Sequence, residues 1–153
     1  MLELYLVSDR SWLNDRSLEE DIEQAILGGV TMVQLREKNL TDEEFTIQAK
    51  KVKTICSKYH IPFIINDNVA VALAVDSDGI HIGQDDQPVK RVRKIIGPHK
   101  IIGVSAHNLK EALAAKEDGA DYLGVGAMFN TSTKDDATAA VSYTHLRAHE
   151  TAA

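Results

Sequence analysis

Short apolar runs alternate along the chain with longer segments in which apolar residues recur every three or four positions. The apolar runs predict six β-strands, at residues 2–7, 31–36, 62–66, 79–83, 100–105 and 122–126. The amphipathic segments between them predict five helices, at residues 18–27, 41–59, 69–75, 88–96 and 109–118. Thr41 and Glu44 match a capping box at the start of the second helix. Strict alternation of strands and helices indicates an α/β protein with a parallel sheet and helical crossovers.

An internal similarity favours a barrel among the α/β folds. The segment GGVTMVQLRE (28–37) resembles DGADYLGVGA (118–127), each with a glycine stop, a short turn and a strand. Repeated βα units of this kind are typical of a (β/α)8 TIM barrel. We therefore expect an incomplete barrel of about six strands and five helices, open at one side. A doubly wound open sheet remains an alternative, because periodicity alone does not separate the two folds.

Polar residues follow five successive predicted strands at their C-terminal ends. They are found in 34–38, in 66–67, in 83–86, at Ser105 with His107 just beyond, and in 130–134. In a (β/α)8 barrel these strand ends meet on one rim, where active sites are built. A polar loop after one strand carries little information, but five in a row predict a functional rim.

The residue types on this predicted rim indicate a magnesium diphosphate. Arg36, Lys38 and Lys134 are cations suited to phosphate oxygens. Asp67 and Asp86 offer two hard oxygen ligands, and Mg²⁺ usually takes one or two carboxylates and completes its shell with water and phosphate. The alternative reading is that these charges form ion pairs with one another.

Three further polar features each have two interpretations. The run Thr131–Lys134 is either a second phosphate cradle or a plain polar turn. His81 lies inside a predicted strand and is interpreted as a packed histidine rather than a ligand. His107 lies near the rim, where an imidazole can act as an acid or a base.

Composition narrows the class of protein. The 153 residues carry a formal net charge of -6, which argues against a nucleic-acid-binding surface. No apolar stretch is long enough to span a membrane, and the N-terminal residues are too acidic for a signal peptide, so we expect a cytoplasmic protein. The single cysteine, Cys56, is interpreted as a small buried hydrophobe. Oligomeric state stays open.

The segments QLREK, IIND, GIHIGQDD, GVSAH and TSTK, in this order, resemble the thiamine phosphate synthase family. The resemblance covers residues 4–143 and implies a (β/α)8 barrel that requires Mg²⁺. The reaction it implies joins hydroxymethylpyrimidine diphosphate to hydroxyethylthiazole phosphate, giving thiamine phosphate and diphosphate. It implies a dissociative substitution, in which diphosphate leaves first and the thiazole nitrogen captures a pyrimidinylmethyl cation. Such chemistry needs cations and magnesium for the leaving charge, and no protein nucleophile.

The resemblance also implies roles for individual residues. The pyrimidine diphosphate site is expected to comprise Gln34, Leu35, Arg36, Glu37, Lys38, Asn66, Ser105 and Lys134. Within it, the residues expected to act in catalysis are Arg36, Lys38, Ser105 and Lys134. Asp67 and Asp86 match the magnesium ligands. The thiazole phosphate is assigned to Thr131, Ser132 and Thr133.

Two alternatives accompany this interpretation. A thiazole tautomerase relative shares the barrel and uses a histidine acid/base, but it needs no diphosphate machinery. The presence of Lys38, Asn66, Asp67, Asp86 and the TSTK loop (131–134) together favours the synthase over the tautomerase. The second alternative is an inactive fragment of the synthase. Asn130 stands where the family commonly has proline, which removes no ligand.

The C-terminal segment departs from the family. After Val141–Tyr143 the resemblance stops, and the chain ends in THLRAHETAA, which we interpret as an unrelated appended stretch. This divides the chain into a partial TIM barrel at 1–141 and a tail at 142–153. Family members continue through two more strands, whose glycine-bearing loops help to bind the thiazole phosphate. We therefore expect the truncated polypeptide to be aggregation-prone, with little or no turnover.

Overall fold

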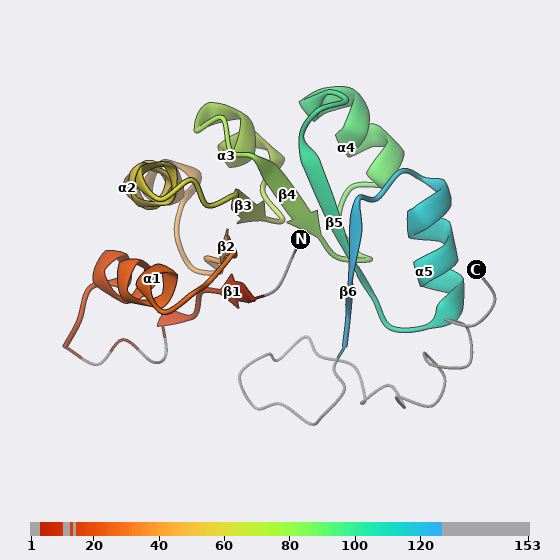
Figure 1. Ribbon diagram of the computed structural model, residues 1–153. Coiled ribbons are helices and arrows are strands. Elements are labelled where there is room, and N and C mark those ends of the chain that lie inside the picture. Colours follow the sequence, from red (N-terminus) through yellow and green to blue (C-terminus); the bar gives the residue numbers. More distant parts are fainter. Residues whose placement is uncertain (1–3, 11–12, 14, 127–153) are drawn as a thin grey trace.

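The strands form one curled parallel sheet with the helices on its outer side (Figure 1). The computed structural model describes residues 4–10, 13 and 15–126. The strands are β1 (Tyr5–Val7), β2 (Met32–Leu35), β3 (Phe63–Asn66), β4 (Gly79–Ile82), β5 (Ile101–Ala106) and β6 (Tyr122–Val125). The helices are α1 (Leu18–Leu27), α2 (Asp42–Lys58), α3 (Val69–Ala74), α4 (Val89–Ile96) and α5 (Leu109–Glu117).

The strand order decides between the two candidate folds. The six strands pair in chain order, β1 to β6, and all five pairings are parallel. A doubly wound sheet reverses its strand order at a switch point, and this sheet has no such reversal. The sheet curls instead into an open half-barrel, so the incomplete (β/α)8 fold is confirmed (Figure 1). Residues 127–153 lie outside the described part of the chain, so the division at 141 stays a prediction.

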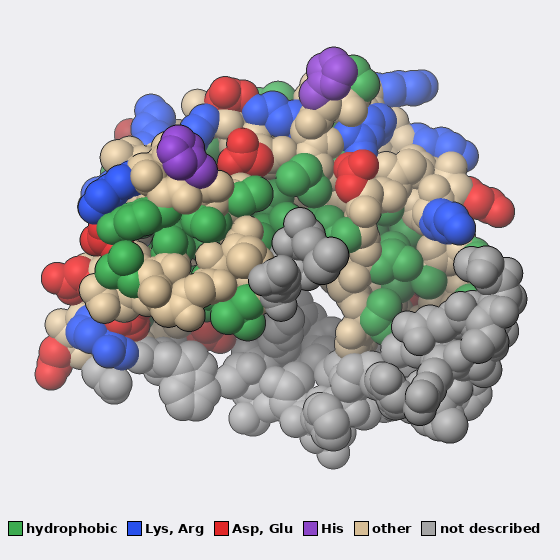
Figure 2. Space-filling view, in the orientation of Figure 1, with side chains coloured by type: hydrophobic (Ala, Val, Ile, Leu, Met, Phe, Trp, Pro, Cys, Tyr) green, Lys and Arg blue, Asp and Glu red, His purple; other side chains and the backbone are tan. Residues whose placement is uncertain are grey.

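Strand side chains alternate between two environments, as the period of a β-strand requires. On the outer face they pack against the helices and form the core, with Val33, Phe63, Ile80 and Ile102 all fully buried. Cys56 belongs to this core, and burial raises the pKa of its thiol to about 12. Figure 2 shows charged side chains around the outside of the arc and hydrophobic ones on the same face inside them.

The helices begin where the sequence predicts them. Thr41 and Glu44 form the expected capping box of α2, and Ser17 and Glu20 form a second one at α1. Each box satisfies backbone N–H groups that have no partner within the helix. No helix in the described ranges has the length and apolar character needed to cross a membrane.

A repeated clamp joins the strands in pairs at their N-terminal ends. The residue just before β2, β4 and β6 is Thr31, Asp78 and Asp121 respectively. Each uses its side-chain oxygen to accept the backbone N–H of the neighbouring strand, from Leu4, Phe63 and Ile102, at 3.0, 2.8 and 2.7 Å. Each of these residues also donates its own backbone N–H to the carbonyl oxygen of the same neighbouring-strand residue. Thr31 and Asp121 occupy equivalent places in the two similar segments of the sequence, so both segments share this clamp.

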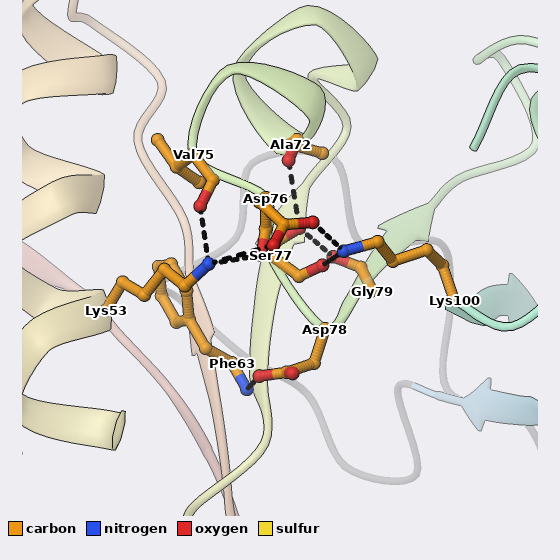
Figure 3. A network of polar contacts seen from close by, with 9 residues as sticks. All are labelled: Lys53, Phe63, Ala72, Val75, Asp76, Ser77, Asp78, Gly79 and Lys100. Atoms are coloured by element: carbon orange, nitrogen blue, oxygen red, sulfur yellow. Dashed lines mark hydrogen bonds and ion pairs between the residues drawn. The ribbon is translucent and has the colours of Figure 1, made fainter. Parts of the chain in front are cut away.

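Figure 3 shows the clamp before β4 and the lysines around it. Lys100 pairs with the Asp76 carboxylate and donates to the Ser77 carbonyl at 2.6 Å. Lys53 donates to the Val75 carbonyl at 2.8 Å. These contacts tie α2 and the start of β5 to the turn that leads into β4, at the end of the sheet opposite the polar rim.

Replacing Asp78 should expose the energetic role of this clamp. Asp78→Ala leaves the N–H of Phe63 without its 2.8 Å acceptor beside a fully buried side chain. We expect a loss of about 1–3 kcal/mol in the free energy of unfolding, the usual cost of a buried donor without a partner. Asp78→Asn keeps an acceptor oxygen and should lose much less. Urea denaturation measures both, and equal losses would show that the carboxylate charge, rather than the accepted hydrogen bond, is what matters.

Candidate functional site

The C-terminal ends of the strands surround one polar cavity of ≈ 430 Å³. Side chains on the inner face of the sheet and in the loops beyond it form its walls. They include Tyr5, Gln34, Arg36, Lys38, Asn66, Asp67, His81, Gln84, Asp85, Asp86, Ser105 and His107. The curl of the sheet therefore gathers residues from β1 to β6 around a space that accommodates a small molecule.

The loop after β2 contributes two cations to the cavity, Arg36 and Lys38. Lys38 Nζ lies 3.2 Å from Asp67 Oδ2, so a lysine and a carboxylate from neighbouring strands already meet on the rim. Both side chains are partly exposed, and ion pairs of this kind contribute little to stability. The pair is thus available to rearrange around a ligand.

Asp67 has an unusual backbone that directs it to the rim. Its φ of 59° lies in the left-handed region, where aspartate and asparagine are the most tolerated residues after glycine. Its N–H donates to the His81 carbonyl at 2.8 Å, so the turn after β3 is anchored to β4. Strained backbone of this kind concentrates at functional sites.

Asp86, in the loop after β4, completes an acidic pair with Asp67. Its Oδ2 accepts the Gly83 N–H at 2.7 Å, which fixes the loop. Partial burial raises the pKa of Asp86, and the adjacent Asp67 carboxylate raises it further. The Asp86 carboxylate, whose charge is disfavoured here, and its neighbour Asp67 form a site that favours a cation.

The acidic pair fits the ligand preference of Mg²⁺. Over the described residues, no three His, Cys, Asp or Glu side chains cluster into a metal site made by protein alone. An ion held by Asp67 and Asp86 alone would take its other ligands from water and from a substrate. Mg²⁺ binds in this way, through one or two carboxylates plus phosphate oxygens.

The inner wall carries polar side chains that are largely buried. Gln34 is 3% exposed, Asn66 8% and His81 8%, each at an inward position of its strand. Ser105 Oγ lies 2.9 Å from His81 Nε2. His81 was expected to be a packed histidine, and the structure shows it both packed and facing the cavity. Sequence patterns did not single out Tyr5, which also lines the cavity, or Tyr122, whose hydroxyl lies within hydrogen-bond distance of both Tyr5 and His81.

Two of the expected site residues have side chains elsewhere. Leu35 points outward and is fully buried in the core between sheet and helices. The Glu37 carboxylate accepts from Arg10 Nε at 2.8 Å and does not line the cavity. Strand alternation explains Leu35, which lies between Gln34 and Arg36, whereas Glu37 lies beyond the end of β2 and pairs with Arg10. The expected Thr131, Ser132, Thr133 and Lys134 lie outside the described residues.

His107 lies at the cavity edge but has a structural partner. Its Nδ1 is 3.1 Å from Glu111 Oε2, and its backbone N–H donates to the same oxygen at 2.8 Å. Glu111 also pairs with Asn108, the N-cap of α5. His107 thus belongs to the start of α5 as well as to the cavity.

These features define an α/β barrel protein whose rim, at the C-terminal ends of its strands, brings cationic and acidic side chains together around one cavity. Comparison with known proteins identifies the family. The family model for thiamine monophosphate synthase matches residues 4–153, and the chain belongs to that family.

Individual relatives agree with the family model. Thiamine-phosphate synthases of Clostridium botulinum and Clostridium tetani are each 60% identical over 88% of this chain. The chain spans 63% and 64% of their lengths, somewhat less than two-thirds. A solved structure of thiamine phosphate pyrophosphorylase from Pyrococcus furiosus is 39% identical over 86% of this chain and 63% of that one, with a TM-score of 0.79.

Proposed function

We propose that this chain supplies the pyrimidine diphosphate and magnesium half of a thiamine phosphate synthase active site. The observation that carries the proposal is the cavity rim, where Arg36 and Lys38 face the acidic pair of Asp67 and Asp86. The reaction is the substitution of diphosphate on a pyrimidinylmethyl carbon by the nitrogen of thiazole phosphate. The substrates are small phosphorylated molecules. The cytoplasmic location expected from the sequence remains a prediction.

Each residue has a task in this proposal. Arg36 and Lys38 bind diphosphate oxygens and stabilise the negative charge that grows on them as the bond to carbon breaks. Asn66 and Ser105 donate to the same group, and Gln34 orients the pyrimidine ring with its amide. Asp67 and Asp86 would hold Mg²⁺, which when bound neutralises charge on the leaving diphosphate.

The remaining expected residues belong to the same proposal. Lys134 would add a further cation at the diphosphate, and Thr131, Ser132 and Thr133 would hold the thiazole phosphate. Leu35 and Glu37 would act through the QLREK backbone or through packing, since their side chains face away from the cavity. Glu37 holds Arg10, which fixes the loop that carries Arg36 and Lys38.

Product formation tests the proposal directly. The curated relatives are longer than this chain, so the assay should use the chain joined to the C-terminal segment of the Clostridium botulinum relative. We expect thiamine phosphate to form from the two phosphorylated substrates in Mg²⁺. The natural relative is the positive control, and failure of a folded fusion would contradict the proposal.

Substituting one carboxylate should stabilise the metal-free protein. The raised pKa of Asp86 means that its ionised form is less favourable in the folded chain than in the unfolded chain. This penalty is present at neutral pH and disappears as the pH falls below the ordinary carboxyl pKa. In EDTA at pH 7, Asp86→Asn should raise the free energy of unfolding, by less than about 1 kcal/mol because water screens the exposed group.

Thermal denaturation with and without Mg²⁺ checks this expectation. Wild type should gain stability from Mg²⁺, because the ion binds the folded state, whereas Asp86→Asn should gain little. Asp85→Asn, in the same loop, is the matched control and should behave as wild type does. A stabilising effect of Mg²⁺ that survives in Asp86→Asn would contradict the assignment of this carboxylate.

A further inference from the structure

Five side chains from five strands form a continuous hydrogen-bonded chain along the inner wall of the cavity. Gln34 Nε2 donates to Tyr5 Oη at 2.7 Å, and Tyr5 Oη lies 2.6 Å from Tyr122 Oη. Tyr122 Oη lies 2.9 Å from His81 Nδ1, and His81 Nε2 lies 2.9 Å from Ser105 Oγ. The chain thus crosses from β2 through β1, β6 and β4 to β5.

The first donor sets the direction of the whole chain. An amide nitrogen only donates, so Tyr5 accepts from Gln34, and the Tyr122 hydroxyl is then the acceptor within reach of the Tyr5 proton. Tyr122 then gives its proton to His81 Nδ1, which must be unprotonated. In a neutral imidazole the proton is then on Nε2, and this N–H donates to Ser105 Oγ. Ser105 accepts there, and its own hydroxyl proton is left for a partner in the cavity.

Close packing keeps the chain in this arrangement. A Cβ added at Gly103 would lie 2.0 Å from the Tyr122 ring, and one at Gly124 would lie 2.9 Å from the His81 ring. Only glycine at these two places leaves room for the two rings. The Tyr5 and Tyr122 rings also meet edge to face, with centroids 5.7 Å apart. Burial raises the pKa of both tyrosines, so both hydroxyls keep their protons at neutral pH.

We propose that Tyr5, Tyr122 and His81 are positioning residues that turn the Ser105 hydroxyl into a hydrogen-bond donor for an anionic oxygen in the cavity. The identity of that oxygen as one of diphosphate rests on the proposed function, whereas the direction of the chain does not. The opposite direction would aim oxygen lone pairs at the ligand and repel it. The donating direction agrees with Arg36 and Lys38, which also prefer an anion in this cavity.

The tautomer of His81 tests the direction independently of any ligand. The protein is labelled with ¹⁵N-histidine, and long-range ¹H–¹⁵N spectra are recorded at about pH 8.5, where an ordinary imidazole is neutral. We expect His81 to show a protonated Nε2 and an unprotonated Nδ1, with its signals assigned by their loss in His81→Asn. A protonated Nδ1 would mean that the hydrogen bonds along the inner wall run in the opposite direction, and this would overturn the proposal.

A double-mutant cycle tests whether Tyr122 acts through Ser105. The probe is inorganic diphosphate with Mg²⁺, titrated by calorimetry into wild type, Tyr122→Phe, Ser105→Ala and the double variant. Each single change should weaken binding about tenfold, the usual effect of a hydrogen bond to a charged group. The double variant should bind no more weakly than Ser105→Ala. Additive losses, about 100-fold in the double variant, would show that Tyr122 acts by packing and would overturn the proposal.

Two further measurements keep the outcomes distinct. Thermal denaturation checks that each variant folds, and Tyr5→Phe replaces Tyr122→Phe if the latter does not, since it breaks the same chain one link earlier. If wild type fails to bind Mg²⁺ and diphosphate, the proposed function fails, and the His81 tautomer alone then decides the direction of the chain.

Discussion

Removing Mg²⁺ with EDTA should weaken binding of the pyrimidine diphosphate by about 100-fold or more. The reason is the composition of the cavity rim, where the diphosphate would meet the carboxylates of Asp67 and Asp86. Lys38 Nζ already forms an ion pair with Asp67 Oδ2 at 3.2 Å. Without a metal, the lysine would therefore have to pair with both this carboxylate and the ligand. A divalent ion reverses the sign of the local field and releases Lys38 for phosphate oxygens.

Calorimetric titration in Mg²⁺ and in EDTA measures this difference on the chain itself. Hydroxymethylpyrimidine without its diphosphate is the matched ligand, and its affinity should be the same in both buffers. The double variant Asp67→Asn/Asp86→Asn should bind the diphosphate in EDTA better than wild type does, and should gain nothing from Mg²⁺. Asparagine suits the left-handed backbone of residue 67, so this variant removes charge without disturbing the turn. Equal affinity of wild type in both buffers would contradict the magnesium assignment.

The strands and helices were predictable from the sequence because each one has its own local pattern of apolar and polar residues. The helix from Leu18 to Leu27 was predicted with the bounds that the structure shows, and the others differ only at their ends. Capping boxes and glycine stops are local chemistry, so they can be read without knowledge of the fold. The strand order and the curl of the sheet were less certain, because both arise from contacts between distant segments.

The candidate site was predictable where it followed strand ends and less so inside the barrel. Gln34, Asn66 and Ser105 follow the simple rule that inward residues at C-terminal strand ends face the site. Leu35 and Glu37 were included because the family motif is contiguous, whereas strand alternation turns Leu35 outward and Arg10 engages the Glu37 carboxylate. Applying the two-residue period of a β-strand to this motif would have predicted an inward side chain at Gln34 and an outward one at Leu35.

The hydrogen-bonded inner wall had no signal in the sequence. Tyr5 and Tyr122 are 117 positions apart, and their hydroxyls meet only because the curled sheet brings β1 opposite β6. The glycines that make room for this wall, Gly103 and Gly124, look like ordinary strand residues until the neighbouring rings are seen. Long-range closure of this kind is a property of the fold rather than of any segment.

Substitutions of the acidic pair and of His107 should separate the synthase from the tautomerase. In the fusion with the Clostridium botulinum segment, Asp67→Asn and Asp86→Asn should each lower kcat/KM by about 100-fold or more, the scale of losing a group that stabilises transition-state charge. His107→Ala should cost less than about tenfold, well below the usual effect of removing a general acid or base. His107 is held by Glu111 at the start of α5, so its loss should appear mainly as reduced thermal stability.

Steady-state assays of thiamine phosphate formation, with denaturation midpoints for every variant, measure this ordering. His107→Asn serves as a milder change, because its amide nitrogen takes the place of Nδ1 and can still donate a hydrogen bond to Glu111. If His107→Ala abolished turnover while the aspartate variants remained active, the chemistry would depend on an imidazole acid or base rather than on a metal-bound diphosphate. That result would favour the tautomerase and would remove the reason for assigning Asp67 and Asp86 to magnesium.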